Sequence, residues 1–225
     1  MAATRRDHRD AAQIRPLEIV QGVLHRADGS AQFDHAPTAV LCGVYGPTEI
    51  KIRDEKVDRA TLEVNYKPAI GSSNTKDRWI EYSLRRVFEG VILTALHPST
   101  LIQLNLQVVS DHGSVLATAF NSATMALMDA GVPMRTVVAS VSCAIDQAGN
   151  VLMDPDEEEE KNATSCHVFV FDAEMKGALF TDSLGNYTPT QFEHCYQSCK
   201  AGAAKVIHFM RAAVEAKLTR QTQQS

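Results

Sequence analysis

The stretch TLIQLNLQVVSDHGSVLATAFNSATMALMDAGVP, Thr100–Pro133, decides the fold class of the chain. Its first part, Thr100–Asp111, alternates apolar and polar residues and predicts a β-strand. Gly113 and Ser114 follow, and a helix of small and apolar residues then runs to Ala130-Gly131. The first N–H groups of a helix have no partner within it, and the helix dipole favours an anion there. The stretch therefore predicts a strand and a helix joined by a turn that offers backbone N–H groups to a phosphate.

Strands and helices are predicted on both sides of this stretch. Asp28-Gly29 is a strong hairpin signal between two short apolar runs. Before the stretch, the sequence predicts a buried strand at Thr38–Pro47, a strand at Thr61–Pro68, a polar loop at Gly71–Arg78 and a helix at Trp79–Leu96. After it, the sequence predicts strands in TVVASVSCAI, VLMD, TSCHVFVFD and GALFTDS, and a last helix from Thr188 to about Arg220. This order predicts an α+β fold with large helices packed on mixed sheets.

The bulk properties of the chain suit one folded domain. It has 225 residues, of which 44% are hydrophobic, and no linker interrupts them. The predicted organisation is a flexible arm at residues 1–14, a single domain over 15–220 and a tail at 221–225. No stretch approaches the roughly 18 apolar residues of a membrane span, so we expect no membrane partner.

Charge and cysteine content narrow the class of protein. The net charge is −5, from 22 Lys and Arg against 27 Asp and Glu, which argues against a free-standing nucleic-acid binder. The five cysteines lie in or beside apolar segments and are expected as free thiols in a reducing compartment. The N-terminal residues lack the apolar core of a signal peptide. We expect a soluble intracellular protein.

Two clusters suggest a metal, and both have a simpler interpretation. The acidic run Asp154–Glu160 places its carboxylates consecutively, which favours a solvated acidic loop over the convergent oxygens that a hard cation needs. His194, Cys195 and Cys199 lie close in sequence, but no second pair at ligand spacing accompanies them. We therefore expect no bound metal and no cofactor.

The remaining candidate residues are predicted to be structural. His112 is expected as a loop residue. Small or flexible apolar side chains in apolar segments favour packing in the core. The residues predicted to pack in this way are Cys42, Cys143, Cys166, Met125, Met128 and Met134.

Basic residues gather in three short segments around the first predicted sheet. Any one of them is explained by solubility, whereas all three together suggest a path for a phosphate backbone. The segments contribute Lys51 and Arg53, Lys76 and Arg78, and Arg85 with Arg86.

Two long strings of the sequence resemble the RNase PH family. These are LHRADGSAQF…TAVLCGVYGPTEIKIR and ALHPSTLIQLNLQVVSDHGSVLATAFNSATMALMDAGVPM, and the likeness covers about residues 15–215. Within the family the chain is most similar to the ring subunits of the eukaryotic RNA exosome. The resemblance implies an RNase PH-like fold, also described as ribosomal protein S5 domain 2-like, with a duplicated βαβα unit.

Active members of that family are phosphorolytic exoribonucleases, and the chain departs from their pattern. The resemblance implies a phosphate site at Gly113 and Ser114, but Val115 stands where the family has an arginine. The first family carboxylate falls near Glu160, and the second falls on Cys166. The resemblance therefore implies a vestigial phosphate site and no catalytic residues.

The resemblance implies a non-catalytic exosome ring subunit that lines a channel for single-stranded RNA. Its expected partners are other RNase PH-like ring subunits, RNA-binding cap proteins and the catalytic nuclease subunit, in the nucleus, nucleolus and cytoplasm. The expected RNA contacts are Lys51, Arg53, Lys76, Arg78 and Arg85. Arg85 is a weaker candidate than the other four, as is the neighbouring Arg86, because both lie on the predicted helix. The alternatives are an assembly scaffold without RNA contact and an active homodimeric nuclease, phosphorolytic or hydrolytic, the latter with a metal at Glu158–Glu160.

Overall fold

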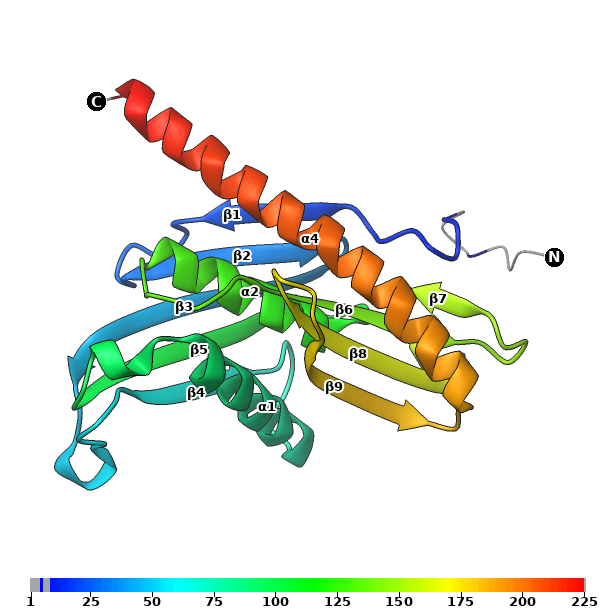
Figure 1. The fold of residues 1–225 in the computed structure, drawn as a ribbon, viewed down its shortest axis with the longest axis horizontal. Coiled ribbons are helices and arrows are strands. Elements are labelled where there is room, and N and C mark those ends of the chain that lie inside the picture. The colour runs from blue at the N-terminus through cyan, green and yellow to red at the C-terminus, as the bar shows by residue number, and fades with distance from the viewer. Residues whose placement is uncertain (1–4, 6–8, 225) are drawn as a thin grey trace. The chain divides into compact units, whose positions relative to one another are not determined.

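The computed structural model describes residues 5 and 9–224, and Figure 1 shows their path. Contacts divide the chain into two compact units. The central unit is Pro16–Val137, and the terminal unit combines the described residues of Met1–Arg15 and Val138–Ser225. Each unit contains its own sheet and its own buried core.

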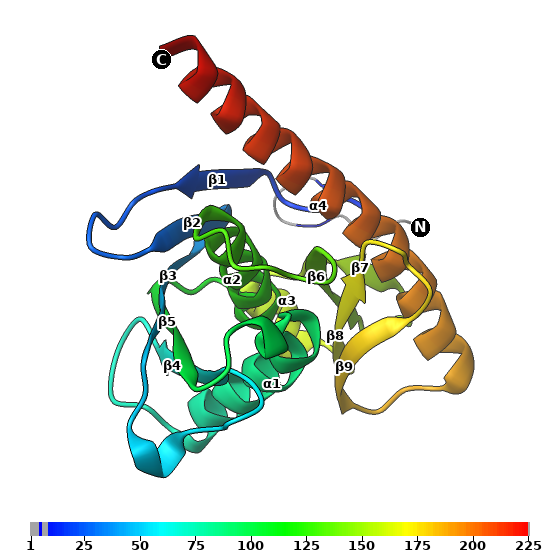
Figure 2. The same ribbon diagram turned by 60° about the vertical axis from the view of Figure 1, so that its left-hand side comes forward.

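The central unit is a five-stranded sheet in the order β1-β2-β3-β5-β4. Strand β4 runs parallel to β5, and the other neighbours are antiparallel. The helices α1 and α2 pack on this sheet, α1 against β4 and α2 mainly against β2 and β3 (Figure 2). Its elements are β1 (Leu17–Gln21), β2 (Gly29–His35), β3 (Thr38–Glu49), η1 (Ile52–Asp54), β4 (Thr61–Lys67), α1 (Thr75–Val91), η2 (Thr94–Leu96), β5 (Thr100–Ser110) and α2 (Val115–Asp129).

Helix α2 shows why its sequence is so rich in small residues. Every residue from Ala117 to Leu127 is buried. Ser122 Oγ donates to the carbonyls of Ala31 and Val40 at 3.1 and 3.0 Å, so the helix lies close to β2 and β3. Larger side chains along this face would hold the helix away from the sheet.

Helix α1 begins four residues before the predicted Trp79. Asn74 and Asp77 form a capping box, in which the Asp77 carboxylate accepts the Asn74 N–H at 2.6 Å. The prediction of a polar loop at Gly71–Arg78 is therefore wrong for its second half, because Lys76 and Arg78 lie in the first helical turn. The helix also ends earlier than predicted, at Val91, because Ile92 becomes extended and pairs with Met134.

The terminal unit is an antiparallel sheet in the order β7-β6-β8-β9, with α4 packed on β6, β7 and β8. All eight residues of β6 are buried. Helix α4 extends to Gln224, four residues beyond the predicted end. The elements are β6 (Val138–Ile145), β7 (Val151–Met153), α3 (Glu157–Asn162), β8 (Ser165–Asp172), β9 (Ala178–Gly185) and α4 (Pro189–Gln224).

The close packing of α4 depends on one glycine. A Cβ atom at Gly202 would lie 3.0 Å from Met153 Cε and 3.2 Å from Ile14 Cδ1. Ile14, near the N-terminus, thus lies against α4 in the terminal unit. None of the helices in the described part of the chain combines the length and the hydrophobicity of a membrane span.

Candidate phosphate and RNA site

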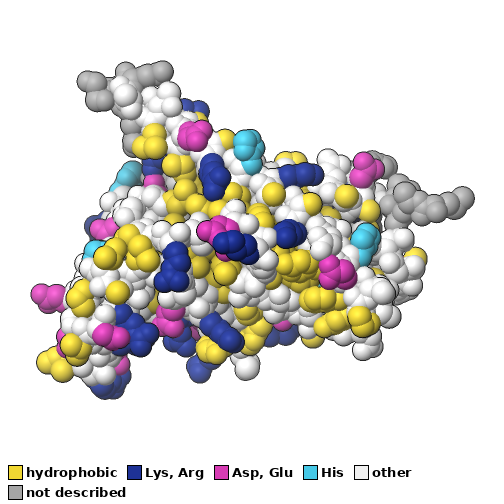
Figure 3. Space-filling model, in the orientation of Figure 1, with side chains coloured by type: hydrophobic (Ala, Val, Ile, Leu, Met, Phe, Trp, Pro, Cys, Tyr) yellow, Lys and Arg dark blue, Asp and Glu magenta, His cyan; other side chains and the backbone are white. Residues whose placement is uncertain are grey.

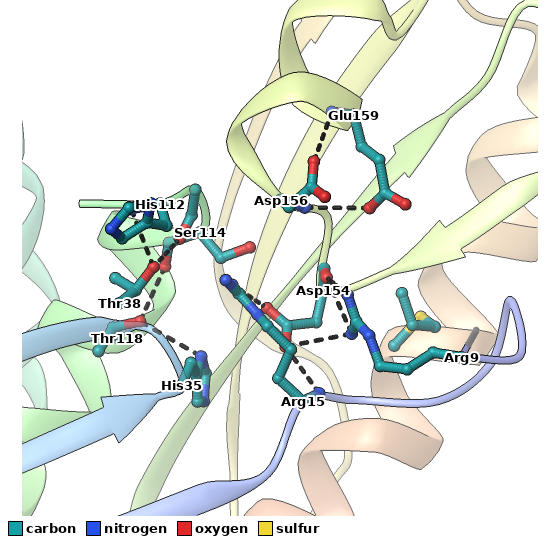
Figure 4. A network of polar contacts seen from close by, with 12 residues as sticks. Arg9, Arg15, His35, Thr38, His112, Ser114, Thr118, Asp154, Asp156 and Glu159 are labelled. Atoms are coloured by element: carbon teal, nitrogen blue, oxygen red, sulfur yellow. Dashed lines mark hydrogen bonds and ion pairs between the residues drawn. The ribbon is translucent and has the colours of Figure 1, made fainter. Parts of the chain in front are cut away.

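The turn before α2 is held in place by Thr38. Gly113 and Ser114 have φ angles of 92° and 59°, so both lie in the left-handed region. Thr38 Oγ1 donates to the Gly113 carbonyl at 2.8 Å and accepts the His112 N–H at 3.1 Å (Figure 4). The Gly113 N–H is donated to Asp111 Oδ1 at 3.2 Å. The predicted Gly-Ser turn is therefore present, and one of its amide groups is engaged by a carboxylate.

The buried His35 contacts the same turn through Thr118. Thr118 Oγ1 donates to the Ser114 carbonyl at 3.0 Å and lies 3.2 Å from His35 Nδ1. His35 is 2% exposed and packs edge-on against Phe33. No pattern in the sequence indicated His35 and Thr38 as supports of this turn. The two residues flank the short turn Ala36-Pro37 and pair in the β2–β3 register, and only the folded sheet brings them to the turn before α2.

The first turn of α2 carries no side-chain charge. Val115, Leu116, Ala117 and Thr118 follow Ser114. Backbone N–H groups and the helix dipole attract an anion only weakly when no cationic side chain assists them. A phosphate held here meets no arginine from α2 itself.

The acidic run is not the solvated loop that the sequence predicts. Asp154 is 1% exposed, and its carboxylate accepts hydrogen bonds from Arg15 Nε at 2.9 Å and Arg15 Nη2 at 2.6 Å (Figure 4). Arg9 lies 3.8 Å from the same carboxylate. Local composition could not indicate this pairing, because the partners are far apart in sequence.

Glu159 is paired with another N-terminal arginine. Its carboxylate accepts Arg5 Nε at 2.8 Å and Arg5 Nη2 at 2.5 Å. Burial acts to raise the pKa of Glu159, but the hydrogen bonds and charge of Arg5 keep that pKa below its ordinary value. The arm predicted over residues 1–14 is thus anchored at Arg5 and Arg9, while residues 1–4 and 6–8 lie outside the described part.

The rest of the run forms the short helix α3. Asp156 accepts the Glu159 N–H at 2.7 Å, and Lys161 pairs with Glu157. Glu158 is exposed. Over residues 5 and 9–224, no three His, Cys, Asp or Glu side chains converge as metal ligands.

Strand β8 carries a thiol where the resemblance implies a carboxylate. Cys166 is half-buried, its Sγ lies 3.7 Å from the Glu160 carbonyl, and burial raises the pKa of the thiol to about 11. The strand holds no Asp or Glu before Asp172. A neutral thiol with that pKa is a poor general base at neutral pH.

The other cysteines and methionines are mostly core residues. Cys42, Cys143, Cys195, Cys199 and Met125 are fully buried, and all five cysteines are free thiols. His194 is exposed whereas Cys195 and Cys199 are buried, so these residues do not converge on a metal.

The predicted RNA contacts are exposed and lie in the central unit. Lys51 and Arg53 belong to the connection from β3 to β4, where Arg53 is 90% exposed. Lys76, Arg78 and Arg85 lie on α1 and are exposed. Lys and Arg side chains gather over this connection and α1 in Figure 3. A phosphate chain could contact such a surface without base specificity.

Comparison with known proteins agrees with the fold and with the resemblance. The model of the "3' exoribonuclease family, domain 1", RNase PH, matches residues 13–133. The chain belongs to the RNase PH family, which confirms the family predicted from the sequence.

Two plant proteins named RRP46 are similar to this chain. An Arabidopsis thaliana protein named "Exosome complex exonuclease RRP46 homolog" is 35% identical over 171 residues, covering 76% of this chain and 72% of the relative. The crystal structure of rice Rrp46 has a TM-score of 0.90 and 30% identity, covering 94% of this chain and all of that chain. An Archaeoglobus fulgidus exosome chain has a TM-score of 0.80 at 20% identity, over 92% of each chain, and shares the fold. The predicted RNase PH-like α+β fold is confirmed.

Proposed function

We propose that this chain is a non-catalytic ring subunit of the RNA exosome, of the ribosomal RNA-processing protein 46 type (exosome component five). The names of the Arabidopsis and rice relatives contain RRP46, and a fission yeast protein named "Exosome complex component rrp46" is 36% identical over 54% of the chain. In this role the chain pairs with other RNase PH-like subunits, and together they form the wall of a channel for 3′–5′ RNA processing and decay.

The lack of activity rests mainly on Val115. Phosphorolysis needs positive charge around the attacking phosphate and a group that handles the proton. The uncharged first turn of α2 lacks that cation, and Cys166 is a neutral thiol. Loss of a charge-clamping arginine lowers such a rate on the order of 10³-fold or more. Gly113 and Ser114 then form a vestigial phosphate site.

The basic residues of the central unit give the chain its role toward RNA. Exposed lysines and arginines bind a phosphate backbone through charge and without reading bases. We assign this contact to Lys51, Arg53, Lys76, Arg78 and Arg85, all exposed or at the exposed β3–β4 connection.

The remaining partners and the location follow from the ring role. Cap proteins that bind RNA would sit on one face of the ring, and a catalytic nuclease subunit would receive the RNA. The chain would act in the nucleus and nucleolus and also in the cytoplasm.

The runner-up function, an active homodimeric nuclease, has less support. Its hydrolytic form needs a metal at Glu158–Glu160, and the Glu159 carboxylate is already engaged by Arg5. Two plant relatives carry the word "exonuclease" in their names, so the nuclease activity of this chain should be assayed directly.

The ring assignment is tested by co-expression with other RNase PH-like ring chains, gentle purification and mass spectrometry of the intact complex. We expect a soluble heteromer containing one copy of this chain. A monodisperse monomer that does not bind the other ring chains would contradict the assignment.

A further inference from the structure

A groove of about 470 Å³ lies in the central unit, where α1 faces the β3–β4 connection and the start of β4. Its volume is in the range of clefts that bind small ligands, about 300–1,000 Å³. Tyr82 lines the groove from α1, and its side chain is 50% exposed. The groove therefore presents a flat aromatic surface to solvent.

Arginines lie around this ring on the same face of the helix. Arg78 and Arg86 are four residues before and after Tyr82, Arg85 is three residues after it, and all three arginines are exposed. The Arg85 guanidinium carbon lies 5.9 Å from the centre of the Tyr82 ring, within the range of a cation–π contact. This contact helps to hold the ring in place, and the exposed half of the ring is available to another flat group.

The charges in the groove favour an anion only slightly. Its two carboxylates, Asp54 and Glu89, are each paired with a cation, at 3.5 and 3.4 Å. Within residues 5 and 9–224, neither Arg85 nor Arg86 makes an ion pair with a carboxylate. The surplus positive charge is small and exposed, so charge alone attracts a phosphate chain weakly here. A ligand of this groove must gain much of its affinity from the ring.

We propose that Tyr82 stacks on a base of single-stranded RNA, while Arg85 and Arg86 contact the phosphates beside that base. The proposal deepens the RNA role proposed for the basic residues of this unit, and it rests on that role. Every base has a flat π face, so such a stack accepts any sequence, and an arginine beside the ring adds a cation–π contribution.

The position of the ring suits an RNA strand that lies along α1. Eight residues of helix separate Arg78 from Arg86, which corresponds to roughly 12 Å along the axis. A strand in this direction meets Arg78 first, then the Tyr82 ring, and then Arg85 and Arg86. Stacking involves no ion pair, so salt screens it less than it screens the phosphate contacts.

The test measures RNA binding by the full chain at low salt, through the fluorescence anisotropy of a labelled oligouridylate. A second probe of the same length has abasic nucleotides, which keep the phosphates and remove the stacking. Tyr82→Ala removes the ring at an exposed helix position that alanine suits, so the variant should fold. Tyr82→Phe keeps the ring. Tyr187→Ala, at a ring that is 42% exposed in the terminal unit, is the matched control.

A photochemical cross-link locates the stack. The oligouridylate is made with 5-iodouridine, irradiated in complex with the native chain, and the linked residue is identified by mass spectrometry of the digested protein. We expect the link at Tyr82, because the iodinated base would lie against that ring.

We expect Tyr82→Ala to weaken oligouridylate binding about tenfold, while Tyr82→Phe and Tyr187→Ala change it less than about twofold. The abasic probe should bind the native chain and Tyr82→Ala equally. The ratio of the two affinities for oligouridylate should stay constant as salt is raised. The loss caused by Lys76→Glu with Arg78→Glu should instead shrink.

Three results would overturn the stacking proposal and leave the RNA contacts of Lys76 and Arg78 in place: unchanged oligouridylate binding in Tyr82→Ala, a comparable loss with the abasic probe, or a cross-link found only elsewhere. A native chain that binds neither probe would overturn both the stack and the RNA role. If Tyr82→Ala binds RNA normally but no longer joins the other ring chains, this face of α1 is a subunit interface and the proposal is wrong.

Discussion

Asp154 is the residue that ties the N-terminal segment to the terminal unit. Its side chain is 1% exposed, and it accepts the Arg15 backbone N–H as well as two guanidinium hydrogen bonds. Both the Arg15 guanidinium and the Asp154 carboxylate are removed from water. Removing either one would therefore leave the other as an uncompensated buried charge. The network also explains why a run that looks like a solvated loop is largely built into the fold.

Replacing this carboxylate should therefore destabilise the protein strongly. We expect Asp154→Ala to lower the free energy of unfolding by about 3–5 kcal/mol, because it leaves the buried Arg15 charge uncompensated. Urea unfolding followed by circular dichroism measures the loss. Asp58→Ala, at a carboxylate that is 74% exposed, should change the value by less than about 0.5 kcal/mol. Similar effects of the two substitutions would contradict the role assigned to Asp154.

His167 makes stability depend on pH. It is fully buried, Ser165 Oγ lies 3.1 Å from its Nε2, and Ser183 Oγ lies 2.9 Å from its Nδ1. Burial lowers its pKa below the ordinary value of 6.5, so the folded state favours the neutral ring. The stability from this preference is present above pH 6.5 and is lost as the pH falls through the lower, folded-state pKa.

Replacing His167 by glutamine, which does not titrate, isolates its contribution to the pH dependence of stability. We expect the stability advantage of the native chain over His167→Gln to shrink as the pH is lowered from 7 toward 5. Thermal unfolding midpoints at several pH values measure it. An advantage that stays constant, or that grows in acid, would show that His167 is not held neutral by burial.

At the scale of elements, α1 illustrates how a local signal sets a boundary. The capping box of Asn74 and Asp77 satisfies backbone N–H groups at the start of the helix. It also places Lys76 and Arg78 on a rigid helix rather than in a mobile loop. We expect Asn74→Ala to reduce stability by about 1 kcal/mol, whereas Ser73→Ala, one residue earlier in the connection, should have little effect. Chemical denaturation tests both, and equal losses would argue against the cap.

Most of the elements could be predicted from sequence periodicity. Strand β5 alternates and α2 is uniformly small and apolar, so pattern alone identifies both. The start of α1 was missed because its cap consists of two polar residues that resemble a loop. The environment of Glu159 could not be predicted at all, since its partner Arg5 is 154 residues away in sequence. The supports of the Gly-Ser turn, His35 and Thr38, likewise come from strands distant in the chain.

At the scale of the whole molecule, the proposed RNA contacts predict a salt-dependent effect. In a reconstituted exosome, Lys76→Glu with Arg78→Glu should weaken the protection of long RNA in nuclease footprints and leave assembly intact. The loss should be smaller at high salt, because phosphate contacts are screened there. Unchanged footprints together with disrupted subunit pairing would assign these two residues to an interface instead.

The central claim, that the chain adopts the fold of a phosphorolytic exoribonuclease without its activity, is tested most directly by an RNA-shortening assay. The purified chain is incubated with 5′-labelled and 3′-labelled single-stranded RNA, inorganic phosphate and magnesium, beside an active member of the RNase PH family. We predict no phosphate-dependent release of nucleoside diphosphates, because Val115 and Cys166 supply neither the cation nor the carboxylate. Nucleoside diphosphate release that disappears in a folded Ser114→Ala variant would contradict the claim.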